Sequence, residues 1–181
     1  MDELHLLDAI TTGDRDAFRA LVEREGAAVF RTCFRVLGRI AEAEDAAQES
    51  FVIAYRAIGT YRGEGTLGAW LGRIATRQAL RRLGQRREAV SLDVVGSTIE
   101  VAGGGPDPLG AALAAEREHA VREAVASLQD PYRETVALRF FAELSLNEIA
   151  AATGRPLGTV KTHLRRGLAR LRDLLLREGS L

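Results

Sequence analysis

Apolar residues recur every three or four positions over most of the chain, which is the period of an amphipathic helix. Between residues 14 and 38 this stripe consists of Phe18, Leu21, Val22, Val29, Phe30, Phe34 and Leu37. Asp14 is a candidate N-cap for this helix and Gly38 a candidate stop. The same period predicts further helices over about 41–57, 67–87, 112–127, 131–142, 146–153 and 157–177. Every predicted element is helical, so the expected fold class is all-α.

Residues 88–111 interrupt the helical pattern. This stretch contains the run Gly103-Gly104-Gly105-Pro106-Asp107-Pro108, which cannot belong to a regular element. Its composition is typical of a flexible linker. We therefore predict two small helical domains, residues 1–87 and 112–181, joined by the flexible linker 88–111.

Composition narrows the class of protein. The 181 residues are 46% hydrophobic and 28% charged, as in an ordinary globular chain, and only 6% aromatic, which disfavours a β-sandwich. The single cysteine, Cys33, excludes an internal disulfide framework and a Cys-rich zinc site. The acidic start resembles no signal peptide, and no apolar run approaches the roughly 20 residues of a membrane span. We expect a cytoplasmic protein without membrane insertion.

The charge alternates in sign along the chain, although the formal net charge is zero. Residues 1–50 carry a net −5, residues 51–100 +4, residues 101–150 −4 and residues 151–181 +5. Lys161 is the only lysine among 25 cations; arginine suits phosphates and guanine edges, although a GC-rich genome also favours it. The segregation into blocks indicates two anionic partners and at least one basic partner.

A helix-turn-helix pattern is the tightest local signal. Ser145 and Glu148 form a candidate capping box, and Ala150, Gly154 and Val160 follow at offsets of 0, 4 and 10. This spacing suits a small residue under a crossing helix, a left-handed turn glycine and an inward apolar residue. The outward positions of the second helix are Thr159, Lys161, Thr162, His163, Arg165 and Arg166. Such side chains suit base edges and phosphates of duplex DNA; the simpler alternative is a basic, solvated helical hairpin.

The helix over 41–57 carries an acidic stripe. At about 100° per residue, Glu42, Asp45 and Glu49 fall on one face. The opposite face holds Ala47, Phe51, Tyr55 and Ile58. We expect this helix to pack by its aromatic side and to expose its carboxylates. Such a stripe is often only a solubilising face, and without a nearby histidine or cleft a metal or acid–base site is not expected.

Basic and aromatic side chains are interleaved between Tyr61 and Arg82. A Gly-rich turn over residues 61–66 precedes a helix on which Arg73, Arg77 and Arg81 recur every four residues. Arginine neutralises phosphate and a turn can hold an unstacked base, which indicates single-stranded nucleic acid. Trp70 is more simply interpreted as a core residue, so the arginines carry this hypothesis.

No catalytic or metal-binding constellation is visible in the sequence. His5, His119 and His163 are scattered, and no Gly-rich phosphate loop or Ser/His/Asp set is present. Cys33 lies on an apolar helix and is expected to be a small core residue. We predict no enzymatic activity, no bound metal and no cofactor.

Four segments together resemble a known family. They are, in chain order, Glu44-Asp45-Ala46-Ala47-Gln48-Glu49-Ser50-Phe51, Tyr61-Arg62-Gly63-Glu64, Trp70-Leu71-Gly72-Arg73-Ile74-Ala75 and Pro156-Leu157-Gly158-Thr159-Val160-Lys161-Thr162. Their combination is similar to that of the extracytoplasmic-function (group IV) sigma factors, the two-domain transcription initiation factors of bacterial RNA polymerase. The resemblance covers nearly the whole chain.

The resemblance implies three binding surfaces. Core RNA polymerase, through its β′ clamp helices and β flap, is the implied protein partner, and the residues that bind the polymerase are Glu42, Asp45, Gln48 and Glu49. The residues implied to bind the melted −10 element of promoter DNA are Tyr61, Arg62, Trp70, Arg73, Arg77, Arg81 and Arg82. The residues implied to bind the duplex −35 element are Arg155, Thr159, Lys161, Thr162, His163, Arg165 and Arg166. An anti-sigma protein that holds the factor inactive is also implied.

Two departures from the family pattern concern promoter choice. The third helix usually reads close to Ile-Ala-Arg-Asn-x-Ala-Leu-Asp, and here Arg77 and Arg81 stand at the Asn and Asp positions. This change favours heavier phosphate contact over the usual −10 preference. The recognition helix commonly continues Ser-Arg-Leu, and here it reads Thr162-His163-Leu164. The promoter sequences of other family members therefore do not transfer to this chain.

Two functional hypotheses follow. The first is a bacterial sigma factor that binds core polymerase and directs promoter recognition, in response to stress or to the state of the envelope. The alternative is a helix-turn-helix regulator that binds an operator without polymerase and usually reads a palindromic site as a dimer. The first hypothesis predicts a complex with core enzyme and weak binding to free DNA.

Overall fold

The computed structural model describes residues 3–92 and 108–177 of the chain, and within these ranges it contains only helices. The elements are α1 (Glu3–Thr11), α2 (Arg15–Leu37), α3 (Ile40–Ala57), the short 3-10 helix η1 (Ile58–Thr60), α4 (Leu67–Leu92), α5 (Pro108–Ser127), α6 (Tyr132–Phe140), α7 (Leu146–Thr153) and α8 (Leu157–Arg177). The all-α prediction is confirmed.

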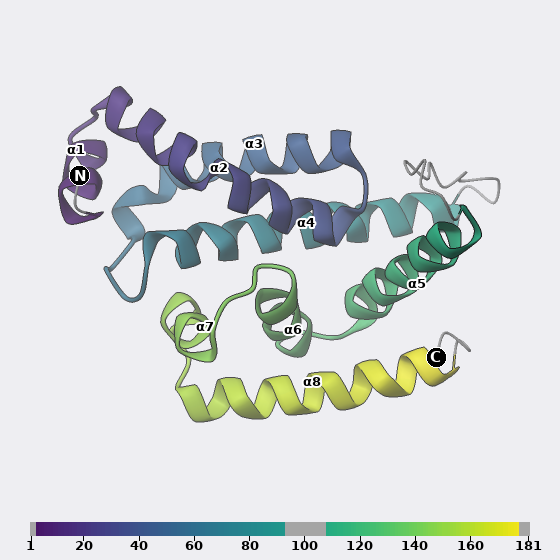
Figure 1. The fold of residues 1–181 in the computed structure, drawn as a ribbon. Helices are drawn as coiled ribbons and strands as arrows, with labels where there is room; N and C mark the ends of the chain where they lie inside the picture. The colour runs from purple at the N-terminus through teal and green to yellow at the C-terminus, as the bar shows by residue number, and fades with distance from the viewer. Residues whose placement is uncertain (1–2, 93–107, 178–181) are drawn as a thin grey trace.

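The helices form two groups that pack against each other (Figure 1). In the first group α2, α3 and α4 contact one another, and α1 lies against α2. In the second group the long helix α8 packs on α5, α6 and α7. Helices α6 and α7 also contact α4, so they lie between α4 and α8.

Local sequence signals set several helix ends. The Asp14 carboxylate accepts hydrogen bonds from the backbone N–H groups of Asp16, at 2.8 Å, and Ala17, at 3.1 Å, and so caps α2. Gly38 ends the same helix with a φ of +74°, a left-handed conformation that glycine adopts at little cost. Both predicted ends of this helix are confirmed.

The structure adds helix at the ends of the predicted elements. Helix α1 was not predicted, although Leu6 and Ile10 are spaced by four residues and are each only 3% exposed in the first-group core. Helix α4 continues to Leu92 and α5 begins at Pro108, so both margins of the predicted linker 88–111 are helical. The rest of the linker, residues 93–107, lies outside the described residues.

The core of the first group is built from aliphatic side chains and contains Cys33. Leu21, Leu71, Leu83 and Cys33 are all fully buried. Burial raises the pKa of the Cys33 thiol to about 11, and this outweighs the opposite influences of Ser50 and Arg82. The prediction that Cys33 is a core residue is confirmed.

Replacement of a helical glycine by alanine is expected to have opposite effects on stability at two positions, Gly167 and Gly84. A Cβ at Gly167 in α8 would lie 2.7 Å from Val136 Cγ2 of α6 and 3.4 Å from Tyr132 Cβ. We expect Gly167→Ala to lower the free energy of unfolding by about 1–3 kcal/mol, because overpacking forces this helix crossing apart. Chemical denaturation followed by circular dichroism measures the change.

Gly84 in α4 provides the matched control for this substitution. A Cβ there would meet no atom within 4 Å. Gly84→Ala should therefore raise the free energy of unfolding by about 0.5–1 kcal/mol, because alanine restricts the unfolded chain. Equal effects of the two substitutions would contradict the tight α6–α8 crossing.

Candidate polymerase and nucleic-acid interfaces

Helix α3 packs mainly through small residues, and part of its aromatic side lies at the edge of this contact. Ala43, Ala46 and Ala54 are completely buried against the neighbouring helices. Phe51 is half-buried, and Tyr55 is 43% exposed with its ring lying edge-on to another aromatic ring at the surface. Of the face expected to be buried, Ala47 and Ile58 are core residues and Phe51 packs against the core, so the expectation is wrong only for Tyr55. The small side chains let α3 approach α2 and α4 closely.

The acidic stripe of α3 faces an arginine row on α4. Glu49 receives Arg81 Nη2 on one carboxylate oxygen and Arg82 Nη2 on the other, each at 2.9 Å. The bond from Arg82 lowers the pKa of Glu49, with a smaller contribution from Arg81. Glu42 pairs with Arg86 Nη1 at 3.3 Å. The outer carboxylates of the stripe and the later arginines of α4 thus neutralise each other.

Asp45 and Gln48 remain at the surface of this stripe. The Asp45 side chain is 67% exposed, and its distance of 3.7 Å to Arg82 Nη1 is long for an ion pair. Gln48 is exposed one turn further along the helix. Of the four candidate polymerase contacts, these two are the most available to a partner.

The Gly-rich turn before α4 is held by aromatic contacts. The Tyr61 hydroxyl donates to the Gly65 carbonyl at 2.8 Å, and its ring centroid lies 5.7 Å from that of Trp70. Trp70 is half-buried against the first-group core, which supports the interpretation of Trp70 as a core residue. Arg62 is exposed in the turn.

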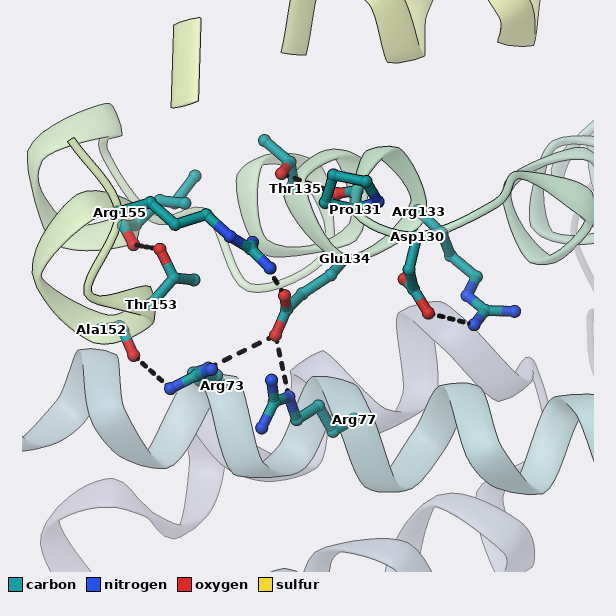
Figure 2. A network of polar contacts seen from close by, with 11 residues as sticks. Arg73, Arg77, Asp130, Pro131, Arg133, Glu134, Thr135, Ala152, Thr153 and Arg155 are labelled. Carbon is teal, nitrogen blue, oxygen red and sulfur yellow. Dashed lines mark hydrogen bonds and ion pairs between the residues drawn. The ribbon is translucent and has the colours of Figure 1, made fainter. Parts of the chain in front are cut away.

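The first two arginines of α4 converge on a carboxylate that the sequence analysis did not single out. Glu134 of α6 accepts from Arg73 Nε at 3.3 Å and Arg77 Nε at 2.8 Å, and its other oxygen accepts from Arg155 Nη1 at 2.9 Å (Figure 2). This group joins the candidate −10 residues to the helix-turn-helix turn. No local motif marks Glu134, which resembles any acidic residue in a first helical turn.

The helix-turn-helix signals are present as predicted. The Ser145 hydroxyl accepts from the Glu148 N–H at 3.2 Å, and the Glu148 carboxylate accepts from the Ser145 N–H at 2.8 Å. Gly154 has a φ of +66° and ends α7. Ala150 packs against the cluster that contains the fully buried Val160 of α8. The capping box, the turn glycine and the inward valine are confirmed.

The N-terminal half of α8 presents a basic face. Lys161, Arg165 and Arg166 are exposed, whereas Thr159 and Thr162 are half-buried. The Thr162 hydroxyl donates to the carbonyl of Gly158 at 3.0 Å, within its own helix. The three cations are the candidate −35 contacts that lie fully at the surface.

His163 lies against α6 rather than pointing outward as the pattern predicted. Its ring meets that of Tyr132 edge-on, with centroids 5.8 Å apart. Its Nδ1 atom is buried without a hydrogen-bond partner in the described structure. Burial lowers the pKa of His163, and the guanidiniums of Arg155 and Arg166 lower it further. The aromatic contact explains the inward orientation.

The described residues offer neither a metal site nor a membrane span. In the described ranges, no three His, Cys, Asp or Glu side chains come together as a metal site would require. None of the helices there combines the length and the apolar character that a membrane span needs.

Both groups of helices match known sequence families. Residues 21–89 match Sigma-70 region 2, which covers most of α2 together with α3 and α4. Residues 118–171 match Sigma-70 region 4, which covers the helix-turn-helix and the helices around it.

Individual proteins are similar over most of their length. The extracytoplasmic-function sigma factor SigW of Bacillus subtilis is 34% identical over 173 residues, which is 92% of both chains. The sigma-H factor of Pseudomonas aeruginosa is 32% identical over 184 residues, covering 96% of this chain and 95% of that protein. The sigma-E factor of Escherichia coli K12 is 31% identical over 166 residues, covering 88% and 86%.

Two solved structures share the fold. CnrH, solved in complex with the cytosolic domain of CnrY, superposes with a TM-score of 0.62 at 24% identity over 96% of both chains. RpoE of Bartonella quintana, solved with the anti-sigma factor NepR, gives a TM-score of 0.54 at 22% identity over 87% of this chain and 96% of that one. Together with the sequence matches, these findings place the chain in the extracytoplasmic-function sigma factors, a family of transcription initiation factors and not of enzymes.

Proposed function

We propose that this chain binds core RNA polymerase and gives it promoter specificity, in response to stress or to the state of the envelope. It acts in the cytoplasm, as a binding subunit without catalysis of its own. Residues 1–87 bind polymerase and the −10 element, and residues 112–181 bind the −35 element. An anti-sigma protein is the regulator of such a chain, as in the complex of RpoE with the anti-sigma factor NepR.

The exposed centre of α3 is the proposed contact with the polymerase β′ clamp helices. Asp45 and Gln48 point to solvent, while Glu42 and Glu49 hold the arginines of α4. An exposed carboxylate with only a long contact, of 3.7 Å, to an arginine of its own chain can guide and orient a basic partner. The β flap is the proposed second contact of the polymerase, with the C-terminal group.

Two surfaces bind promoter DNA in this proposal. The turn before α4, with Tyr61 and Arg62, and the helix itself, with Trp70, Arg73 and Arg77, receive the melted −10 strand. The exposed cations of α8 receive the duplex −35 element, as a helix in the major groove does. A single observation carries the proposal: one chain unites an exposed acidic helix with a basic helix-turn-helix.

Co-elution with core polymerase tests this function. The purified chain mixed with core RNA polymerase is expected to elute from a size-exclusion column as a 1:1 complex that starts transcription at specific promoters. Without polymerase, it should bind duplex DNA weakly, because its −35 surface alone supplies few contacts.

A chain that never co-elutes with polymerase but binds a palindromic duplex tightly as a dimer would be an operator-binding regulator. The same column run with the DNA alone distinguishes the two outcomes.

A further inference from the structure

Glu134 lies at the centre of the contact between the two groups of helices (Figure 2). Its side chain is only 8% exposed, and guanidiniums from three places in the sequence surround it. Two of them, from Arg73 and Arg77, come from the first group, and Arg155 comes from the second. One carboxylate thus bridges both groups.

The electrostatics make this arrangement depend on the carboxylate. Burial alone would raise the pKa of Glu134, but the charges of Arg77, Arg73 and Arg155 outweigh burial and lower it. Burial also lowers the pKa of Arg73, and the neighbouring Arg77 adds to this effect. Without the carboxylate, three cations would share a partly buried space and repel each other.

Small residues allow the surrounding surfaces to meet closely. Ala69 of α4 is 2% exposed and belongs to the same apolar cluster as Leu138 and Ile149 of the second group. A Cβ at Gly65, in the turn before α4, would lie 2.9 Å from Ala151 Cβ of α7. The second group therefore covers the face of α4 and the turn that the proposed function gives to the melted −10 strand.

We propose that Glu134 is a latch that takes the place of nucleic-acid phosphate on Arg73 and Arg77 and keeps the free chain closed. Promoter binding then requires α6 and α7 to leave α4, which frees both arginines for the DNA backbone. Glu134 keeps Arg155 as a partner after opening, because both belong to the second group. This inference rests on the proposed function and adds the regulation of its −10 surface.

A reversible disulfide across this interface tests whether opening is necessary. A Cβ at Gly72 of α4 would lie 3.7 Å from Ala142 Cβ, within the usual range of about 3.5–4.5 Å for disulfides. The variant Gly72→Cys/Ala142→Cys should bind core polymerase and start transcription when reduced and lose promoter-directed transcription when oxidised. The buried Cys33, with its raised pKa of about 11, should not compete for the new thiols.

The controls separate the latch from the proposed function. Each single-cysteine variant should be equally active with and without reductant. If the oxidised double variant starts transcription as well as the reduced one, the latch is wrong and the proposed function stands. If the wild-type protein also fails with core polymerase, the proposed function is wrong, and the next experiment decides on the latch alone.

The second experiment needs no polymerase. Glu134→Gln removes the charge at nearly constant shape, and the free chain should become larger by small-angle X-ray scattering. It should also bind a fluorescein-labelled single-stranded oligothymidylate more tightly. The plot of log K against log[salt] should become steeper by about 1.4, because two more phosphates, at about 0.7 each, are neutralised.

Glu118→Gln is the matched control for this variant. It makes the same charge change at a carboxylate that is 67% exposed and pairs with Arg122 of the same helix, α5. Its size by small-angle X-ray scattering, and its slope of log K against log[salt], should equal those of the wild-type protein. Circular dichroism verifies that both variants keep their helices. A Glu134→Gln chain as compact as the wild type, with an unchanged salt slope, would overturn the latch.

Discussion

The variant Asp45→Lys is expected to lose measurable binding to core polymerase while it keeps its fold. Asp45 has a side chain that is 67% exposed and lies 3.7 Å from Arg82 Nη1, so a lysine there can turn into solvent and its introduction disturbs little within the chain. A lysine there would face a partner surface built for a carboxylate, and like charges across an interface cost several kcal/mol. We therefore expect affinity to fall by at least about 100-fold.

The choice of position follows from the contacts of the stripe. Reversal of Glu49 would place a cation beside Arg81 and Arg82 and disturb the α3–α4 contact, so loss of binding there would have two explanations. Glu23→Lys, an equal change at an exposed position of α2, is the control. Titration of labelled core polymerase gives the affinities, and thermal melting gives the stability. Unchanged affinity of the Asp45 variant would remove α3 as the polymerase contact.

Arg165→Ala is expected to alter promoter choice rather than general activity. A bidentate contact to a base contributes about 1–3 kcal/mol of discrimination, which is about a 5- to 150-fold preference at one base pair. Loss of a phosphate contact would instead weaken all promoters alike. Lys161→Ala is expected to behave in the same way at a different base pair. Competitive transcription from promoters with single substitutions in the −35 element measures both effects.

Arg172→Ala is the control for these two variants. This side chain lies further along α8, is 69% exposed and has Asp173 Oδ1 at 3.5 Å from its Nη2. The substitution removes the same charge, but outside the N-terminal half of the helix. Promoter preference should therefore stay as in the wild-type protein. If Arg165→Ala and Lys161→Ala leave promoter preference equally unchanged, α8 does not read bases with these residues.

The sequence was informative wherever a residue acts on its own neighbours. Asp14 caps the helix that begins beside it, and Ser145 and Glu148 bond to each other three residues apart. Gly154 takes the left-handed conformation that its turn requires. Signals of this kind need no knowledge of the rest of the fold, because the partners are local. They were sufficient to predict the helix-turn-helix.

The packing of α3 shows that helical periodicity places a buried face only approximately. The pattern placed Ala47, Phe51, Tyr55 and Ile58 on the buried face. Ala47 and Ile58 are buried, but the centre of the buried face is Ala43, Ala46 and Ala54, and Tyr55 is 43% exposed. A helix that lies close to two others is packed best by small side chains, and hydrophobicity alone ranks these below tyrosine or phenylalanine. The acidic residues were assigned correctly to the other side, but their arginine partners were not predicted.

Contacts between distant segments could not be read from the sequence. Glu134 lies 61 residues after Arg73 and 57 after Arg77, and nothing in their local patterns relates them. The sequence predicted the arginines as a surface for nucleic acid, and the structure gives them a carboxylate of the same chain. Tertiary packing decides which charges meet, and a single sequence does not encode this in any short motif.

The pairing of the α4 arginines has a consequence for how the free protein behaves among chromosomal DNA. Attraction to bulk DNA comes mainly from the counterions that unpaired cations release. Here Arg81 and Arg82 meet Glu49, Arg77 meets Glu134, and the whole chain has a formal net charge of zero. An arginine-rich protein built in this way can diffuse through the nucleoid without being held by non-specific binding to DNA. It therefore remains available to its polymerase.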